Sequence, residues 1–158
     1  MKKASLYLLA IALLALVPAL GVAAEKSHAY KAELSGGAVV PKVTTTAKGA
    51  AEFETALGGK ELKYKLTVED IEYVTAAHIH IGKKGKNGPP VAGLFAGPKK
   101  EGKFSGTLGE GMIADTDLVG PMAGKTVKDL VKALRSGELY VNVHTDKYPD
   151  GELRGQIK

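Results

Sequence analysis

The chain has 158 residues, a length that fits one domain, and it contains neither cysteine nor tryptophan. Without cysteine the protein can form no disulfide and offers no thiol for a bacterial lipid anchor, so its stability must come from an apolar core. The formal net charge is +5, from 22 basic and 17 acidic residues, which is too mild to favour nucleic acid as a partner.

The first residues have the pattern of a secretory signal peptide. Two lysines precede an almost continuous apolar run over residues 4–20, and small residues follow up to Ala24. We expect cleavage after Ala24, so that residues 1–24 are a signal peptide and residues 25–158 form a periplasmic or secreted domain. An uncleaved membrane anchor is the alternative, although the run is near the lower length limit for spanning a bilayer. No second apolar run of that length follows, so we expect no membrane span after cleavage.

The remainder consists of short runs in which apolar and polar residues alternate, separated by glycine and proline. This pattern is typical of an all-β sandwich or barrel. The clearest run is Glu61–Glu69, where Leu62, Leu66 and Val68 point one way and charged residues point the other. The runs that we expect to be strands are 28–35, 50–57, 61–69, 73–81, 91–95, 103–108, 138–145 and 152–158.

One segment changes from strand to helix periodicity. Between residues 126 and 135, Val127, Leu130, Val131 and Leu134 recur at helical spacing. Thr126 is a good N-cap, with an aspartate three residues later, and a glycine follows the segment. The pattern predicts one short helix, inserted before the last two strands.

Three histidines fall on two of the expected strands. Residues i and i+2 of a strand point to the same face, so His78 and His80 project together, roughly 6.5–7 Å apart along it. In the strand 138–145, His144 and Asn142 share the face opposite to the apolar residues. All three histidines therefore lie on faces turned away from the core. If the two strands are neighbours, which the periodicity does not decide, three imidazoles form one site outside the sheet.

Imidazole is a good ligand for copper, zinc, iron and nickel, and copper leads that series in affinity. We therefore expect a metal site of His78, His80 and His144 with an open position, with copper as the first choice of cofactor and zinc as the second. The alternative is that these histidines are ordinary surface residues. Asn142 is expected either to orient an imidazole from behind or to be an ordinary polar residue of a strand edge.

Charged residues near these strands have simpler interpretations. The three lysines at 83, 84 and 86 follow His80 and could steer an anion to the metal, although a solvated loop is the simpler reading. Asp146, Asp150 and Glu152 resemble calcium ligands in composition, but their spacing fits a Pro-Asp-Gly turn. His28 is expected to be a surface residue at the start of the first strand.

Several motifs resemble those of the CHRD domain family. The segment 76–82 (AAHIHIG) with 88–91 (GPPV) is similar to its first signature. The segments 139–145 (LYVNVHT) and 148–157 (YPDGELRGQI) are similar to its closing one, and Leu34-Ser35-Gly36 with Val40-Pro41 is similar to its opening. The resemblance covers nearly all of residues 25–158. It implies an exported CHRD domain, a family without a single established activity.

A weaker resemblance concerns the copper site of Cu/Zn superoxide dismutase. His78 and His80 are similar to its His-x-His pair, and His144 is similar to its late-strand copper ligand. The resemblance implies a Greek-key antiparallel sandwich or barrel with a mononuclear copper site, since residues matching the bridging histidine, the zinc ligands, the disulfide and the active-site arginine are not found. We therefore predict an exported protein that binds one metal ion, with copper preferred. The alternatives are a superoxide dismutase-like copper enzyme and a non-catalytic structural or adhesion module without metal.

Overall fold

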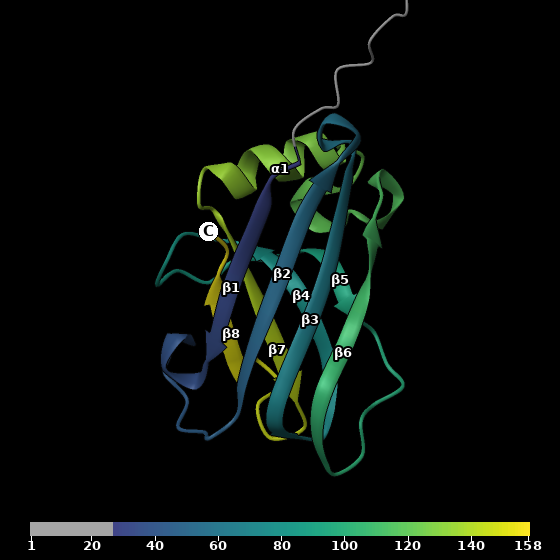
Figure 1. The fold of residues 1–158 in the computed structure, drawn as a ribbon. Coiled ribbons are helices and arrows are strands. Elements are labelled where there is room, and N and C mark those ends of the chain that lie inside the picture. The colour runs from purple at the N-terminus through teal and green to yellow at the C-terminus, as the bar shows by residue number, and fades with distance from the viewer. Residues whose placement is uncertain (1–26) are drawn as a thin grey trace, which may run out of the picture.

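The structure is a computed structural model that describes residues 27–158, so the predicted signal peptide over residues 1–24 lies outside the described residues. The described part contains eight strands, one α-helix and four short 3-10 turns (Figure 1). The helix is α1 (Val127–Arg135). The strands are β1 (Ala29–Ser35), β2 (Lys48–Ala56), β3 (Glu61–Glu72), β4 (Val74–Ile81), β5 (Pro90–Phe95), β6 (Lys103–Ile113), β7 (Leu139–Thr145) and β8 (Leu153–Gln156).

All eight strands belong to one antiparallel sheet, in the order β5-β4-β7-β8-β1-β2-β3-β6. The sheet curls until its edge strands β5 and β6 approach each other, which makes a nearly closed barrel (Figure 1). Across the seam, the hydroxyl of Tyr64 on β3 donates a hydrogen bond to the carbonyl oxygen of Leu94 on β5 at 3.0 Å. The prediction of an all-β antiparallel sandwich or barrel with one short helix is confirmed.

Strand β6 is longer than the sequence indicated. We expected a strand over residues 103–108, whereas β6 continues to Ile113. Glycines interrupt the alternation of side chains in its second half and so concealed the strand. A Cβ atom at Gly109 would collide with the carbonyl oxygen of Leu94, whereas one at Gly111 would only be in ordinary contact with the Tyr64 ring at 3.4 Å. Gly109 therefore lets β6 approach the seam closely.

The inward faces of the strands fill the barrel with apolar side chains. The largest fully buried side chains come from five of the strands, from α1 and from the C-terminal end of the chain, and they form one continuous cluster. They are Leu62, Leu66, Val68, Ile71, Val74, Ile79, Ile113, Leu130, Leu134, Leu139, Leu153 and Ile157. This core supplies the stability that a chain without disulfides needs.

Strands β4 and β7 are hydrogen-bonded neighbours, which the sequence pattern alone could not decide. Their register places His78 opposite Asn142, His80 opposite Tyr140 and Ala76 opposite His144. The alternate residues point inward, and Ile79 and Val141 are both 0% exposed. The three histidines therefore stand together on the outer face of the sheet.

Helix α1 covers one end of the barrel (Figure 1). It begins where predicted, because the Thr126 side chain accepts a hydrogen bond from the backbone N–H of Asp129 while the Asp129 carboxylate accepts one from the backbone N–H of Thr126. Its apolar side, which includes Leu130, is buried against the core, and Lys128 on the other side is exposed. Within residues 27–158, no helix has the length and apolar character needed to cross a bilayer.

The packing of α1 leads to a stability prediction. Leu130→Ala should lower the free energy of unfolding by about 2–5 kcal/mol, because it removes a fully buried side chain and leaves a cavity at the end of the barrel. Lys128→Ala on the exposed side of the same helix is the control and should change it by less than about 0.5 kcal/mol. Urea denaturation of both variants measures the difference, and equal effects would show that the helix does not pack as described.

Candidate metal centre

The imidazole rings of His78, His80 and His144 converge at one point on the outer face of β4 and β7. The ring centroid of His78 lies 5.8 Å from that of His80 and 5.2 Å from that of His144. The centroids of His80 and His144 are 5.8 Å apart. One nitrogen atom from each ring can be chosen such that all three lie within 4.8 Å of one another. These separations suit three ligands of a single metal ion.

Backbone carbonyl groups fix which nitrogen two of the rings present. The carbonyl oxygen of Gly88 lies 2.9 Å from Nδ1 of His80, and that of Pro149 lies 2.8 Å from Nδ1 of His144. A carbonyl oxygen can only accept a hydrogen bond, so each Nδ1 carries the proton and each Nε2 keeps a free lone pair. Both rings therefore present Nε2 as the atom able to bind a metal.

One further nitrogen of each ring is buried without a hydrogen-bond partner. Nδ1 of His78, Nε2 of His80 and Nε2 of His144 are all shielded from solvent, and none has a hydrogen bond. Leaving a buried polar atom unpaired costs free energy, on the order of 1–3 kcal/mol. A single ligand shared by the three adjacent rings could satisfy all three atoms at once.

The environment also keeps two of the imidazoles uncharged. Burial, followed by the neighbouring His144 and His80, lowers the pKa of His78 from 6.5 to about 4. Burial lowers the pKa of His80 as well, assisted by His144 and Arg154 and opposed by the hydrogen bond to Gly88. A neutral imidazole is the form that binds metal, so at neutral pH these rings need not lose a proton first.

Asn142 supports the turn behind His144. Its side-chain Nδ2 donates to the carbonyl oxygen of Asp150 at 2.9 Å, one residue from the Pro149 carbonyl that accepts from His144. A Cβ atom at Gly151 would collide with the Asn142 side chain, so the turn lies directly over it. The described contacts thus place Asn142 behind the turn, and its role in orienting an imidazole stays a prediction.

The three rings face an open hollow of about 440 Å³. Besides the histidines, its walls are formed by small and polar residues: Thr75, Ala76, Pro90, Thr145, Asp146 and Pro149. The lysines that follow His80 do not line this hollow. Lys84 lines a different hollow, and the side chain of Lys83 lies 3.8 Å from the carboxylate of Glu138. Any steering by these lysines would act from outside the hollow, and this role stays a prediction.

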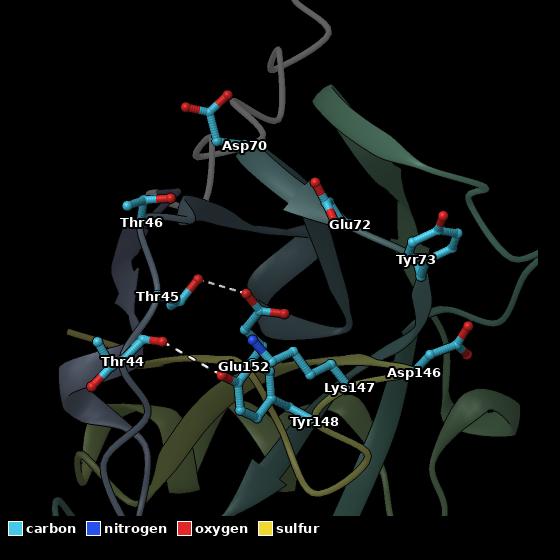
Figure 2. Close-up of a pocket in the computed structure, with 10 residues that line it drawn as sticks. All are labelled: Thr44, Thr45, Thr46, Asp70, Glu72, Tyr73, Asp146, Lys147, Tyr148 and Glu152. Atoms are coloured by element: carbon cyan, nitrogen blue, oxygen red, sulfur yellow. Dashed lines mark hydrogen bonds between the residues drawn. The ribbon is translucent and has the colours of Figure 1, made fainter.

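A larger hollow of about 820 Å³ is shown in Figure 2. Asp146 lines both this hollow and the one over the rings. In the larger hollow, the buried carboxylate of Glu152 accepts hydrogen bonds from the hydroxyls of Thr45 at 2.6 Å and Thr145 at 2.8 Å. These bonds tie the turn after β7 to the segment between β1 and β2. Glu152 therefore has a structural role, and it does not gather with Asp146 and Asp150 to form a calcium site.

Two further residues at the site were not singled out from the sequence. Tyr140 stacks on His80, with ring centroids 5.1 Å apart and planes inclined by 20°. The guanidinium of Arg154 lies 3.6 Å from the centroid of the Tyr140 ring. Arg154 is only 2% exposed and Tyr140 likewise 2%. An arginine on the outward face of a strand is expected to be solvated, so only the fold reveals its burial.

Comparison with known proteins identifies one family. A family model described as the CHRD domain matches residues 30–157. This range contains the helix, the three converging histidines and all eight strands. Only the first residue of β1 lies outside it. Neither the curated proteins nor the solved structures gave a match.

The lowered pKa of His78 leads to a prediction about acid stability. The unfolded chain should protonate this histidine near pH 6.5, whereas the native protein does so only near pH 4. Between these values the unfolded state binds more protons, so the stability of the metal-free protein should fall as the pH is lowered through this window. Above pH 6.5 this contribution should be constant.

Urea denaturation across this pH window measures the effect. His78→Asn should reduce the slope of stability against pH, and the same change at the exposed His28 should leave it as in the wild type. An NMR titration of the wild type should show His78 protonating near pH 4. A midpoint at the ordinary value would contradict the burial and mutual repulsion described above.

Proposed function

The chain belongs to the CHRD domain family, and on that premise we propose that it is an exported module that binds one metal ion through His78, His80 and His144. Copper is the preferred metal and zinc the second choice. One observation carries the proposal: three rings converge with one buried, unpaired nitrogen each. A metal ion is a ligand that satisfies all three nitrogens at once.

The donor set supports a transition metal. All three candidate ligands are imidazoles, and the cluster includes no carboxylate, which disfavours calcium and magnesium because these ions prefer oxygen ligands. Copper has the highest affinity for nitrogen ligands in the divalent series. The hollow over the rings leaves room for a further ligand, such as water or a small anion. Both features favour copper, with zinc as an alternative.

We also propose that the protein is exported and cleaved after Ala24, which leaves residues 25–158 as the mature domain. The support is the pattern of lysines, apolar run and small residues at its start. In the periplasm or outside the cell, the domain would meet metal ions without competition from the cytoplasmic thiol pool. The mass of the exported protein should correspond to a chain that begins at Glu25; a retained apolar run would contradict cleavage.

The central prediction concerns stoichiometric metal binding. Purified protein should bind one equivalent of Cu(II), measured by isothermal titration, with nitrogen hyperfine coupling in its EPR spectrum. The triple variant His78→Ala, His80→Ala, His144→Ala should lose this binding, because it removes all three ligands. His28→Ala is the matched control and should bind as the wild type, since His28 is exposed and outside the cluster. Unchanged affinity in the triple variant would refute the proposal.

The open hollow over the rings favours a second candidate, a copper enzyme similar to superoxide dismutase, because a small anion could reach the ion. Copper-loaded protein should then remove superoxide faster than the same amount of free copper. A rate no better than free copper would reject catalysis and leave metal binding intact. Metal analysis of the protein isolated after natural export tests the third alternative, a structural module. Such a module would carry no metal, whereas a metal-binding protein or a copper enzyme would.

A further inference from the structure

Arg154 is a buried positive charge without an anionic partner. Its side chain is 2% exposed, and it takes part in none of the ion pairs formed within residues 27–158. Burying an unpaired charge is costly, so a fold that retains one must satisfy it in another way. The contacts of the guanidinium show how this is done and where its charge acts.

The guanidinium is satisfied by neutral oxygen atoms of the loop that follows β4. It donates to Oδ1 of Asn87 at 2.8 Å and to the carbonyl oxygens of Lys86 at 2.8 Å and Lys83 at 3.3 Å. None of these acceptors carries a negative charge, so the positive charge is solvated but not neutralised. The loop is also the segment that supplies the Gly88 carbonyl to Nδ1 of His80.

Tyr140 connects this charge to the metal site. Its strand β7 lies between β8, which carries Arg154, and β4, which carries His80. The guanidinium lies 3.6 Å from the Tyr140 ring centroid, and the His80 ring stacks on the same tyrosine at 5.1 Å. The Tyr140 hydroxyl accepts a hydrogen bond from the N–H of Gly88 and donates one to the carbonyl oxygen of the same residue. Arg154, Tyr140 and His80 therefore form one fixed column that ends at a candidate ligand.

The cluster of three rings includes no carboxylate. An imidazole binds a metal in its neutral form, so three imidazole ligands would leave a bound ion its full charge. Asp146 lines the hollow, but its carboxylate pairs with Lys99 at 3.0 Å. A fixed positive charge disfavours a divalent ion more than a monovalent one. At a separation of roughly 10 Å and an effective dielectric constant of about 20, the difference is about tenfold in affinity.

We propose that Arg154 sets the selectivity of the three-histidine site in favour of Cu(I) over divalent ions, an inference that rests on the proposed metal-binding function. Arg154 acts through its buried charge and through the column that it forms with Tyr140 and His80. It is a selectivity residue and touches no ligand directly. Three imidazole nitrogens also supply the low coordination number that Cu(I) accepts, whereas divalent ions usually require additional ligands.

The test compares Cu(I) and Zn(II) affinities in the full mature protein, with a chromogenic Cu(I) chelator and a zinc indicator as competitors. Arg154→Gln and Arg154→Met remove the charge and should raise the affinity for Zn(II) relative to Cu(I) by about tenfold. Arg154→Lys keeps the charge but not the forked hydrogen bonds, and it should keep the wild-type ratio. Lys84→Gln removes an exposed charge from the same loop and is the matched control.

The ratio separates selectivity from general damage to the site. The inference would be overturned if Arg154→Gln and Arg154→Met lost affinity for both ions equally. It would also be overturned if Arg154→Lys behaved like these two variants. Either result would leave the proposed function standing. A wild-type protein that binds neither ion would refute the proposed function itself. If Arg154→Gln and Arg154→Met do not fold, a measurement on the wild-type protein tests the inference instead. Its bound Cu(II)/Cu(I) couple must have a higher reduction potential than a three-imidazole model ligand in water, and an equal or lower value overturns the inference.

Discussion

The antiparallel pairing of β4 with β7 is the interaction on which the candidate metal centre depends. It brings His144 beside His78 and His80, although these residues are far apart in the chain. A slip of one residue would turn the histidines of the moved strand to the opposite face. The inner face prevents this, because side chains such as Ile79 and Val141 are completely buried there. The histidines thus owe their positions to core packing in which they take no part.

Much of the fold and of the site could be predicted from the sequence, and the limits have physical causes. Alternation showed that His78, His80 and His144 face away from the core, but alternation assigns faces and not strand neighbours. It also failed in β6, where glycines leave no side chains to alternate. Arg154 was missed for another reason: a loop distant in the chain buries it, and no local pattern records such a contact.

The outer face of β4, β7 and β8 behaves as a small polar core under the loop after β4. Its hydrogen bonds are numerous: the two N–H groups of the Gln156 side chain are shared among the carbonyl oxygens of Gly82, Gly137 and Leu139. A Cβ atom at Gly88 would collide with the backbone of Ile81, so glycine lets the loop lie flat on the sheet. Five buried polar atoms of this layer lack a hydrogen bond: one nitrogen on each of the three imidazoles, Oδ1 of Asn142 and Oε1 of Gln156. A metal ion bound at the rings would satisfy the three nitrogens together. Because only the folded chain gathers them, binding there would stabilise the fold.

The three rings differ in how firmly they are held, and this difference bears on the chemistry of the site. His80 and His144 are each anchored from behind by a carbonyl oxygen, whereas no hydrogen bond within residues 27–158 anchors the ring of His78. The buried Nδ1 of His78 likewise has no hydrogen-bond partner. If a metal ion binds here, the two anchored rings would fix its place, whereas the ring of His78 has no such anchor. An arrangement of this kind suits an ion whose preferred geometry changes with its charge, as that of copper does and that of zinc does not.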